Sequence, residues 1–142
     1  MRLELSRRGD YAVRAMIALA DEDGTALTAD QIAGRTRVPR SYLAQVMADL
    51  SRGGLVEPRI GRLGGYRLSR PAEEISLLAV IDAIEGDTRR TTCVMRNAPC
   101  GADGRCTAHA AFSDAQEAWR AALGGSSLAS VLGRVAAPPG SA

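Results

Sequence analysis

A short helical segment, a tight turn and a longer helical segment follow one another directly, and this succession strongly restricts the fold. Thr28 predicts an N-cap, and Gln31 stands three residues later, where a capping box requires it. This first segment is expected to end near Thr36. After a turn over 37–39, a helix is expected over 41–52, with apolar residues on one face at Leu43, Val46, Met47 and Leu50. The pair predicts a helix-turn-helix.

Two short extended segments come next. Gly53 and Gly54 close the longer helix, and residues 55–57 and 64–68 predict two strands. Between them, residues 58–63 predict a hairpin loop that carries Arg59 and Arg62. A helix-turn-helix followed at once by such a hairpin predicts a winged helix, and a surface hairpin without a partner is the alternative. We therefore expect a mainly α fold with a small two-stranded wing.

The remaining periodicity predicts four further helical segments, at 8–20, 77–85, 107–123 and 127–134. Ser76 is the expected cap of the second of these. Residues 86–106 lack periodicity and contain all three cysteines, so they predict a loop. We expect a winged-helix domain over 1–86, a cysteine-containing loop over 87–106, a helical dimerisation region over 107–134 and a disordered tail over 135–142.

Charge is unevenly distributed between the two halves of the chain. Residues 1–70 contain 12 arginines and 8 acidic residues, whereas residues 71–142 contain 6 arginines and 8 acidic residues. Such asymmetry indicates a phosphate-binding half, and a solvated arginine-rich surface is the alternative. The N-terminal part of the longer helix and the hairpin loop are the expected DNA-contacting surfaces. The candidate residues are Arg37, Arg40, Ser41, Tyr42, Gln45, Arg59 and Arg62.

One narrow apolar seam runs along the segment 107–123. Its members recur at spacings of four and three: Ala108, Phe112, Ala115, Trp119 and Ala122. A seam this narrow fits a helix that pairs with its symmetry mate, so Phe112, Ala115 and Trp119 are candidate dimerisation residues. Burial within the monomer is the alternative.

Three cysteines and the sole histidine fall within seventeen positions. These are Cys93, Cys100, Cys106 and His109. Neither a leader-like N-terminus nor an apolar run near the roughly 20 residues of a membrane span is evident, so we expect a cytoplasmic protein with no membrane partner. Disulfides are disfavoured there, and clustered thiolates then suit an iron–sulfur cluster or zinc. Free cysteines on a loop are the alternative.

The combined pattern resembles the Rrf2 family of winged-helix transcriptional regulators, most closely its IscR branch. The resemblance covers about residues 1–134 and is carried by Tyr11-Ala12-Val13, Ser41-Tyr42-Leu43, Gly64-Gly65-Tyr66 and the cysteine spacing. It implies a homodimer that binds a palindromic operator in double-stranded DNA and holds one cluster per subunit. By similarity to IscR, Cys93, Cys100, Cys106 and His109 would ligate a [2Fe–2S] cluster.

The NsrR-like branch of the same family implies a second set of ligands. Its members combine three cysteines with an aspartate from the partner subunit on a [4Fe–4S] cluster, and Asp10 lies close to the matching position. Asp10 could instead act as a helix N-terminal carboxylate that interacts favourably with the helix dipole.

These observations predict a transcriptional regulator, in the form of a repressor, that senses iron–sulfur status, redox state or nitric oxide. The alternative within this class is a cysteine-thiol or zinc-containing regulator without a cluster. An enzyme is not expected, because the sequence offers no acid/base pair, no nucleophile with a partner and no glycine-rich phosphate loop.

Overall fold

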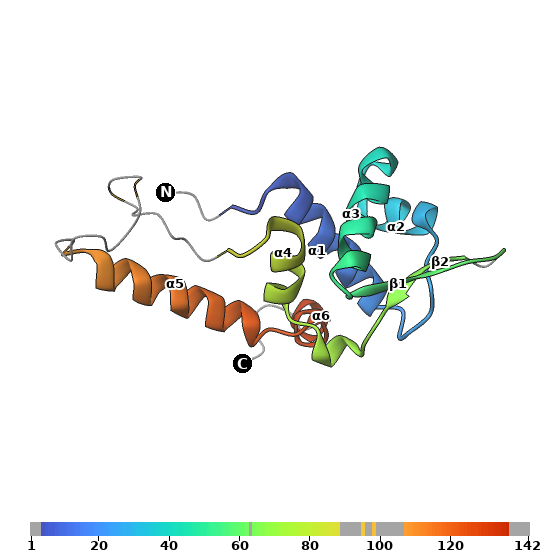
Figure 1. Ribbon diagram of the computed structural model, residues 1–142. Helices are drawn as coiled ribbons and strands as arrows, with labels where there is room; N and C mark the ends of the chain where they lie inside the picture. The colour runs from blue at the N-terminus through green and yellow to red at the C-terminus, as the bar shows by residue number, and fades with distance from the viewer. Residues whose placement is uncertain (1–3, 63, 89–94, 96–97, 99–106, 137–142) are drawn as a thin grey trace.

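The computed structural model describes residues 4–62, 64–88, 95, 98 and 107–136. Within these residues the fold is mainly α-helical with one two-stranded antiparallel sheet, as the sequence predicts (Figure 1). The elements in chain order are α1 Arg7–Ala20, α2 Ala29–Thr36, α3 Arg40–Arg52, β1 Val56–Arg59, β2 Gly65–Leu68, the 3₁₀ turn η1 Ala72–Glu74, α4 Leu77–Glu85, α5 His109–Gly124 and α6 Leu128–Ala136.

Side-chain caps fix the starts of three helices. The hydroxyl of Ser6 accepts from the Gly9 backbone N–H at 3.0 Å, and that of Ser76 accepts from Ala79 at 3.0 Å. Thr28 and Gln31 form the predicted capping box, with distances of 3.2 and 2.9 Å. Because each cap satisfies a backbone donor that the helix leaves open, these helices begin within a residue of the predicted positions.

The core forms around α1, which packs against α2, α3 and α4. It consists of aliphatic, methionine and alanine side chains, and Phe112 and Trp119 lie outside it. The largest fully buried side chains are Met16, Leu19, Leu27, Ile32, Leu43, Met47, Leu50, Ile75 and Leu128. The apolar face predicted for α3 is this core face, so α3 is anchored from behind while its opposite side meets solvent.

The wing is the β1–β2 hairpin, paired from Val56 opposite Leu68 to Arg59 opposite Gly65. Its base is tied to the loop before α2, because Leu27 and Tyr66 exchange backbone hydrogen bonds of 2.9 and 2.8 Å. Strand β1 continues through Pro58 and Arg59, two residues that the sequence pattern assigns to the hairpin loop. Proline is tolerated there because a two-stranded sheet consists of edge strands.

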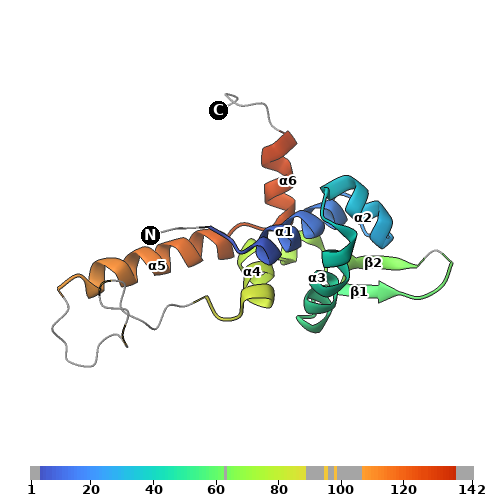
Figure 2. The same ribbon diagram turned by 90° about the horizontal axis from the view of Figure 1, so that it is seen from above.

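Helix α5 extends from one end of the molecule, and the wing extends from the other (Figure 1 and Figure 2). The short helix α6 returns to the body, where Leu128 is fully buried and its backbone N–H donates to Ile75 at 2.9 Å. Helix α6 includes Val135 and Ala136, so it continues two residues into the segment expected to be a tail.

None of the helices in the described part of the chain is both long enough and apolar enough to span a membrane.

Candidate nucleic-acid interface and cysteine segment

The expected DNA-contacting residues gather on the solvent side of the helix-turn-helix. Arg37 is the C-cap of α2 and adopts the left-handed conformation, with φ of 59°. Arg40, Ser41, Tyr42 and Gln45 lie in the first turns of α3 and are all exposed. This exposure agrees with the sequence prediction, which placed them opposite the apolar face of the same helix. The N-terminal end of α3 therefore presents these four side chains to solvent.

Acidic side chains neutralise several of the arginines in this half of the chain. Arg8 of α1 and Arg52 both form ion pairs with Asp49, whose side chain is only 6% exposed. On the wing, Arg67 pairs with Glu57 at 2.9 Å. Arg40 donates to the exposed carboxylate of Asp30 at 2.8 Å. Phosphate binding by Arg40 must therefore compete with Asp30.

Three candidate arginines differ from these in their surroundings. Among the described residues, Arg37, Arg59 and Arg62 make no ion pair, and all three are exposed. They lie at the α2–α3 turn and on the wing. A guanidinium without an acidic neighbour can bind a phosphate without first breaking an internal pair. These three are thus the strongest candidates for phosphate contacts.

Tyr42 is held in place by an aromatic neighbour. Its ring centroid lies 5.9 Å from that of Tyr11 in α1, with the planes inclined by 53°. The side chain remains 47% exposed. Contact on one side restricts the rotamer of the ring, while the exposed side stays available to a ligand.

The three cysteines lie outside the described residues, as does most of the segment that contains them (residues 89–106, hereafter the cysteine segment). His109 is the exposed first residue of α5. Within the described residues, no three His, Cys, Asp or Glu side chains come close enough together to hold a metal ion. The donor set itself, three thiols and an imidazole, has the chemistry that iron–sulfur clusters and zinc require.

Asp10, the alternative fourth ligand, lies in the first turn of α1. Its two carboxylate oxygens pair with Nε and Nη2 of Arg14, each at 3.0 Å. This i, i+4 ion pair and the position near the helix N-terminus account for a carboxylate there without a metal. Ligation by Asp10 would have to displace Arg14.

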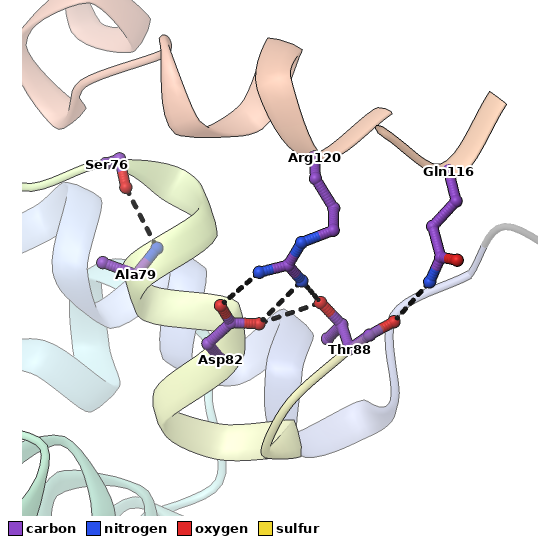
Figure 3. A network of polar contacts seen from close by, with 6 residues as sticks. All are labelled: Ser76, Ala79, Asp82, Thr88, Gln116 and Arg120. Carbon is purple, nitrogen blue, oxygen red and sulfur yellow. Dashed lines mark hydrogen bonds and ion pairs between the residues drawn. The ribbon is translucent and has the colours of Figure 1, made fainter. Parts of the chain in front are cut away.

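A polar network holds the described residues on both sides of the cysteine segment (Figure 3). Arg120 of α5 pairs with Asp82 of α4 at 3.1 Å and also donates to the hydroxyl of Thr88. The same hydroxyl donates to Asp82 at 2.8 Å, and Gln116 donates to the carbonyl of Thr88 at 3.3 Å. Thr88 immediately precedes the cysteine segment, and the Arg120 guanidinium of α5 joins this residue to Asp82 of α4.

The seam of α5 is covered only in part by the rest of the described chain. This helix has no buried residue, Phe112 is 37% exposed, Ala115 is exposed and Trp119 is only partly buried. The described part of the monomer therefore leaves Phe112 and Ala115 exposed and covers Trp119 only in part, and pairing of α5 with a second copy stays a prediction.

The sequence pattern did not predict the polar partners of the paired arginines, Asp30 and Asp49. Nor did it predict the network of Asp82, Thr88 and Arg120 beside the cysteine segment. Arg8 and Asp49 are separated by 41 positions, so no local pattern could pair them. A weak signal existed for Arg120, which is the sole arginine in an alanine-rich helix.

A helix-turn-helix, a basic wing and an exposed helix α5 at the opposite end of the molecule are typical of a winged-helix transcriptional regulator. A family model described as Rrf2, iron-dependent transcriptional regulator, matches residues 5–134. The chain therefore belongs to the Rrf2 family of transcriptional regulators.

Individual relatives agree with this assignment. The chain is 37% identical to the transcriptional regulator IscR of Xenorhabdus nematophila over 128 residues, which cover 89% of this chain and 77% of that protein. It is 38% identical over 85 residues to a protein of Mycobacterium tuberculosis named as an HTH-type transcriptional regulator; this match covers 59% of this chain and only 53% of that protein's length. A solved structure of IscR from T. potens shares 27% identity and a TM-score of 0.74, covering 94% of this chain and 88% of that one. CymR of B. subtilis, at 24% identity and a TM-score of 0.78 over 92% and 96% of the two chains, shares the fold.

Proposed function

We propose that this regulator is a repressor that binds a palindromic operator as a homodimer and senses its signal through an iron–sulfur cluster. DNA binding is supported by three exposed arginines that have no acidic partner among the described residues. These are Arg37, Arg59 and Arg62. Helix α3 would enter the major groove, and the wing would contact the adjacent backbone or minor groove. Such a target implies action in the cytoplasm.

Dimerisation is proposed along α5. Its apolar seam is exposed in the described monomer, and the helix projects away from the wing (Figure 2). Pairing of two such helices would bury Phe112, Ala115 and Trp119. It would also leave both copies of α3 free, as a palindrome with half-sites about one DNA turn apart requires.

The proposed cluster ligands are Cys93, Cys100, Cys106 and His109, with Asp10 as the alternative fourth ligand. His109 is favoured because the resemblance to IscR implies a histidine as the fourth ligand. Ligation by Asp10 would have to displace Arg14, which pairs with both of its carboxylate oxygens. A bound cluster would supply redox- or nitric-oxide-sensitive chemistry. We propose a [2Fe–2S] cluster instead of [4Fe–4S], because a set of three cysteines and one histidine is similar to the ligands of the IscR branch.

The polar network around Thr88 offers a route from the cysteine segment to the DNA-binding surface. Arg120 fixes Thr88 to α4, and α4 packs against both α1 and α3. A change in the cysteine segment would therefore act on the angle between α5 and the winged-helix body. In a dimer joined through α5, that angle sets the separation of the two α3 helices.

The cofactor assignment is tested by absorption and Mössbauer spectroscopy of protein purified without oxygen. A coloured protein with a two-iron spectrum that loses its colour in Cys100→Ala is the expected result. A colourless protein with zinc or no metal would overturn the cluster and favour the second candidate function.

That second candidate is a thiol- or zinc-based regulator without a cluster. It is supported by the likeness to two solved structures of CymR from Staphylococcus aureus. The first shares 27% identity and a TM-score of 0.70. The second, an oxidised form, shares 26% identity and a TM-score of 0.69. In this case Cys93, Cys100 and Cys106 would themselves be the sensing groups, and oxidation of the metal-free protein would change its affinity for DNA.

A further inference from the structure

Ile60 is a fully exposed apolar side chain at the tip of the wing, with a relative exposure of 103%. It follows the last residue of β1, and such exposure leaves it no packing among the described residues that would explain a branched apolar residue in a turn. Turns usually carry Gly, Asn, Asp, Ser or Pro at such positions, and the fold gains nothing from this isoleucine. A lone exposed apolar residue is common by itself, so its setting must carry the inference.

That setting is cationic on both sides. Arg59 precedes Ile60 and Arg62 follows it two residues later, and neither guanidinium has an acidic partner within the described residues. The nearest carboxylate in the sequence, that of Glu57, pairs with Arg67. An uncharged tip is thus placed between two available positive charges.

Two glycines allow the backbone of the wing tip to form a tight turn. The Gly64 N–H donates to the Gly61 carbonyl at 2.9 Å, which closes a tight turn with Arg62 at its second position. Gly61 has φ of 121°, and a Cβ at Gly64 would lie 2.7 Å from the carbonyl oxygens of Arg59 and Gly61. The glycines let the turn close on itself, and Ile60 and Arg62 beside it are both exposed.

We propose that Ile60 enters the minor groove of the operator and contacts the deoxyribose walls, while Arg59 and Arg62 bind the phosphates on either side. The inference rests on the proposed binding of DNA and adds an apolar specificity element to the wing. The minor groove is about 6 Å wide, and its walls are formed by sugar carbons. Apolar side chains between cations fit this surface and respond to groove width and to how easily the base steps open. Ile60 would therefore favour A·T-rich steps at the edge of each half-site.

The test compares Ile60→Thr with Ile60→Val. Both variants keep a β-branched side chain in an exposed position, so unchanged thermal unfolding is expected for each. The probe is a pool of DNA duplexes with random sequence, from which the wild-type protein and each variant separately enrich binding sites. Affinity for the duplex that the wild-type protein enriches most (the selected operator) is then measured at several salt concentrations.

Ile60→Thr should bind the selected operator about tenfold more weakly, which corresponds to partial loss of one buried apolar side chain. The slope of affinity against salt should not change, because no phosphate contact is lost. The A·T preference at the half-site edges should weaken in Ile60→Thr and persist in Ile60→Val.

Equal affinity and equal base preference in wild type and Ile60→Thr would overturn the inference while leaving DNA binding intact. Failure of the wild-type protein to enrich any sequence would overturn both. Binding to vesicles of phosphatidylglycerol and phosphatidylcholine is measured in parallel. If Ile60→Thr binds these vesicles more weakly than wild type but binds DNA equally well, the tip contacts a membrane surface and the inference is overturned.

Discussion

Gly65 shows how one missing side chain fixes the wing to the body of the protein. A Cβ at this position would lie 2.2 Å from the backbone oxygen of Leu27, and the residue has φ of 151°. The close approach permits the paired hydrogen bonds between Leu27 and Tyr66. Residue 65 must therefore lack a side chain for the loop before α2 to contact the wing.

Gly65→Ala should lower the free energy of unfolding by roughly 2 kcal/mol or more, since the wing must separate from Leu27 or adopt a strained backbone. Denaturant unfolding at fixed protein concentration measures the effect. Gly34→Ala is the matched control, because Gly34 lies within α2 and a methyl group added there would meet no neighbouring element within 4 Å. It should raise stability by about 0.5–1 kcal/mol.

Arg62 and Arg67 lie on the same hairpin, but only Arg67 forms an ion pair among the described residues. Arg62→Ala should weaken binding to the selected operator and reduce the salt slope by about one unit, the value for one lost phosphate contact. Arg67→Ala serves as the control on the same hairpin, because Arg67 already pairs with Glu57 at 2.9 Å and should change the slope little. An equal loss of slope in both variants would mean that the two arginines are equivalent despite their different surroundings.

Among the elements, Asp49 joins the DNA-facing helix to the core helix. It lies in α3 and pairs with Arg8 of α1 and Arg52 of its own helix, while Gln45 donates to it at 3.1 Å. The carboxylate is nearly buried, and both guanidinium groups remain partly in water. These contacts restrain the orientation of α3 relative to α1.

Asp49→Ala should destabilise the fold by roughly 1–3 kcal/mol, because it leaves its partners without a charged acceptor beside the core. Asp30→Ala is the comparison, since Asp30 is 87% exposed in its pair with Arg40. Its effect should stay within about 0.5 kcal/mol. A thermal or denaturant series on both variants measures the difference, and equal losses would show that the burial of Asp49 does not matter.

The helices and the wing were predictable because local signals determine them. Thr28 and Ser76 cap helices at the expected positions, and the apolar face of α3 became the core face. The end of β1 was not predictable, because Pro58 and Arg59 lie in a sequence typical of a turn. They belong to the strand because they pair with Tyr66 and Gly65 of β2. Ion pairs such as Arg120 with Asp82 depend on packing between distant helices, which periodicity does not encode.

For the molecule as a whole, the exposed seam of α5 predicts a dimer. Phe112→Asp should convert the protein to a monomer, because it places a charge in the proposed interface, and it should leave the winged-helix body folded, since α5 contributes no buried residue. Ala121→Asp, on the opposite side of the same helix, is the control and should remain dimeric. Sedimentation equilibrium distinguishes the two, and a monomeric wild-type protein would remove the interface.

The two functional surfaces differ in how far sequence could define them. Residues of α3 and the wing were found from the helix-turn-helix pattern, and the structure separates the arginines that pair with described acidic residues from those that do not. The cysteine segment was found from spacing alone, and its residues 93, 100 and 106 lie outside the described part of the chain. What the structure adds there is the attachment of Thr88 to α4 and α5 through Arg120.

Control of DNA binding by a cluster on the cysteine segment is the proposal on which the regulatory role depends. It is tested by measuring, without oxygen, the affinity of wild-type protein and of Cys100→Ala for the selected operator. Cys100→Ala should remain a folded dimer but bind markedly more weakly than the cluster-containing protein. Equal affinity of the two proteins would contradict cluster control and leave a winged-helix DNA-binding protein without this sensor.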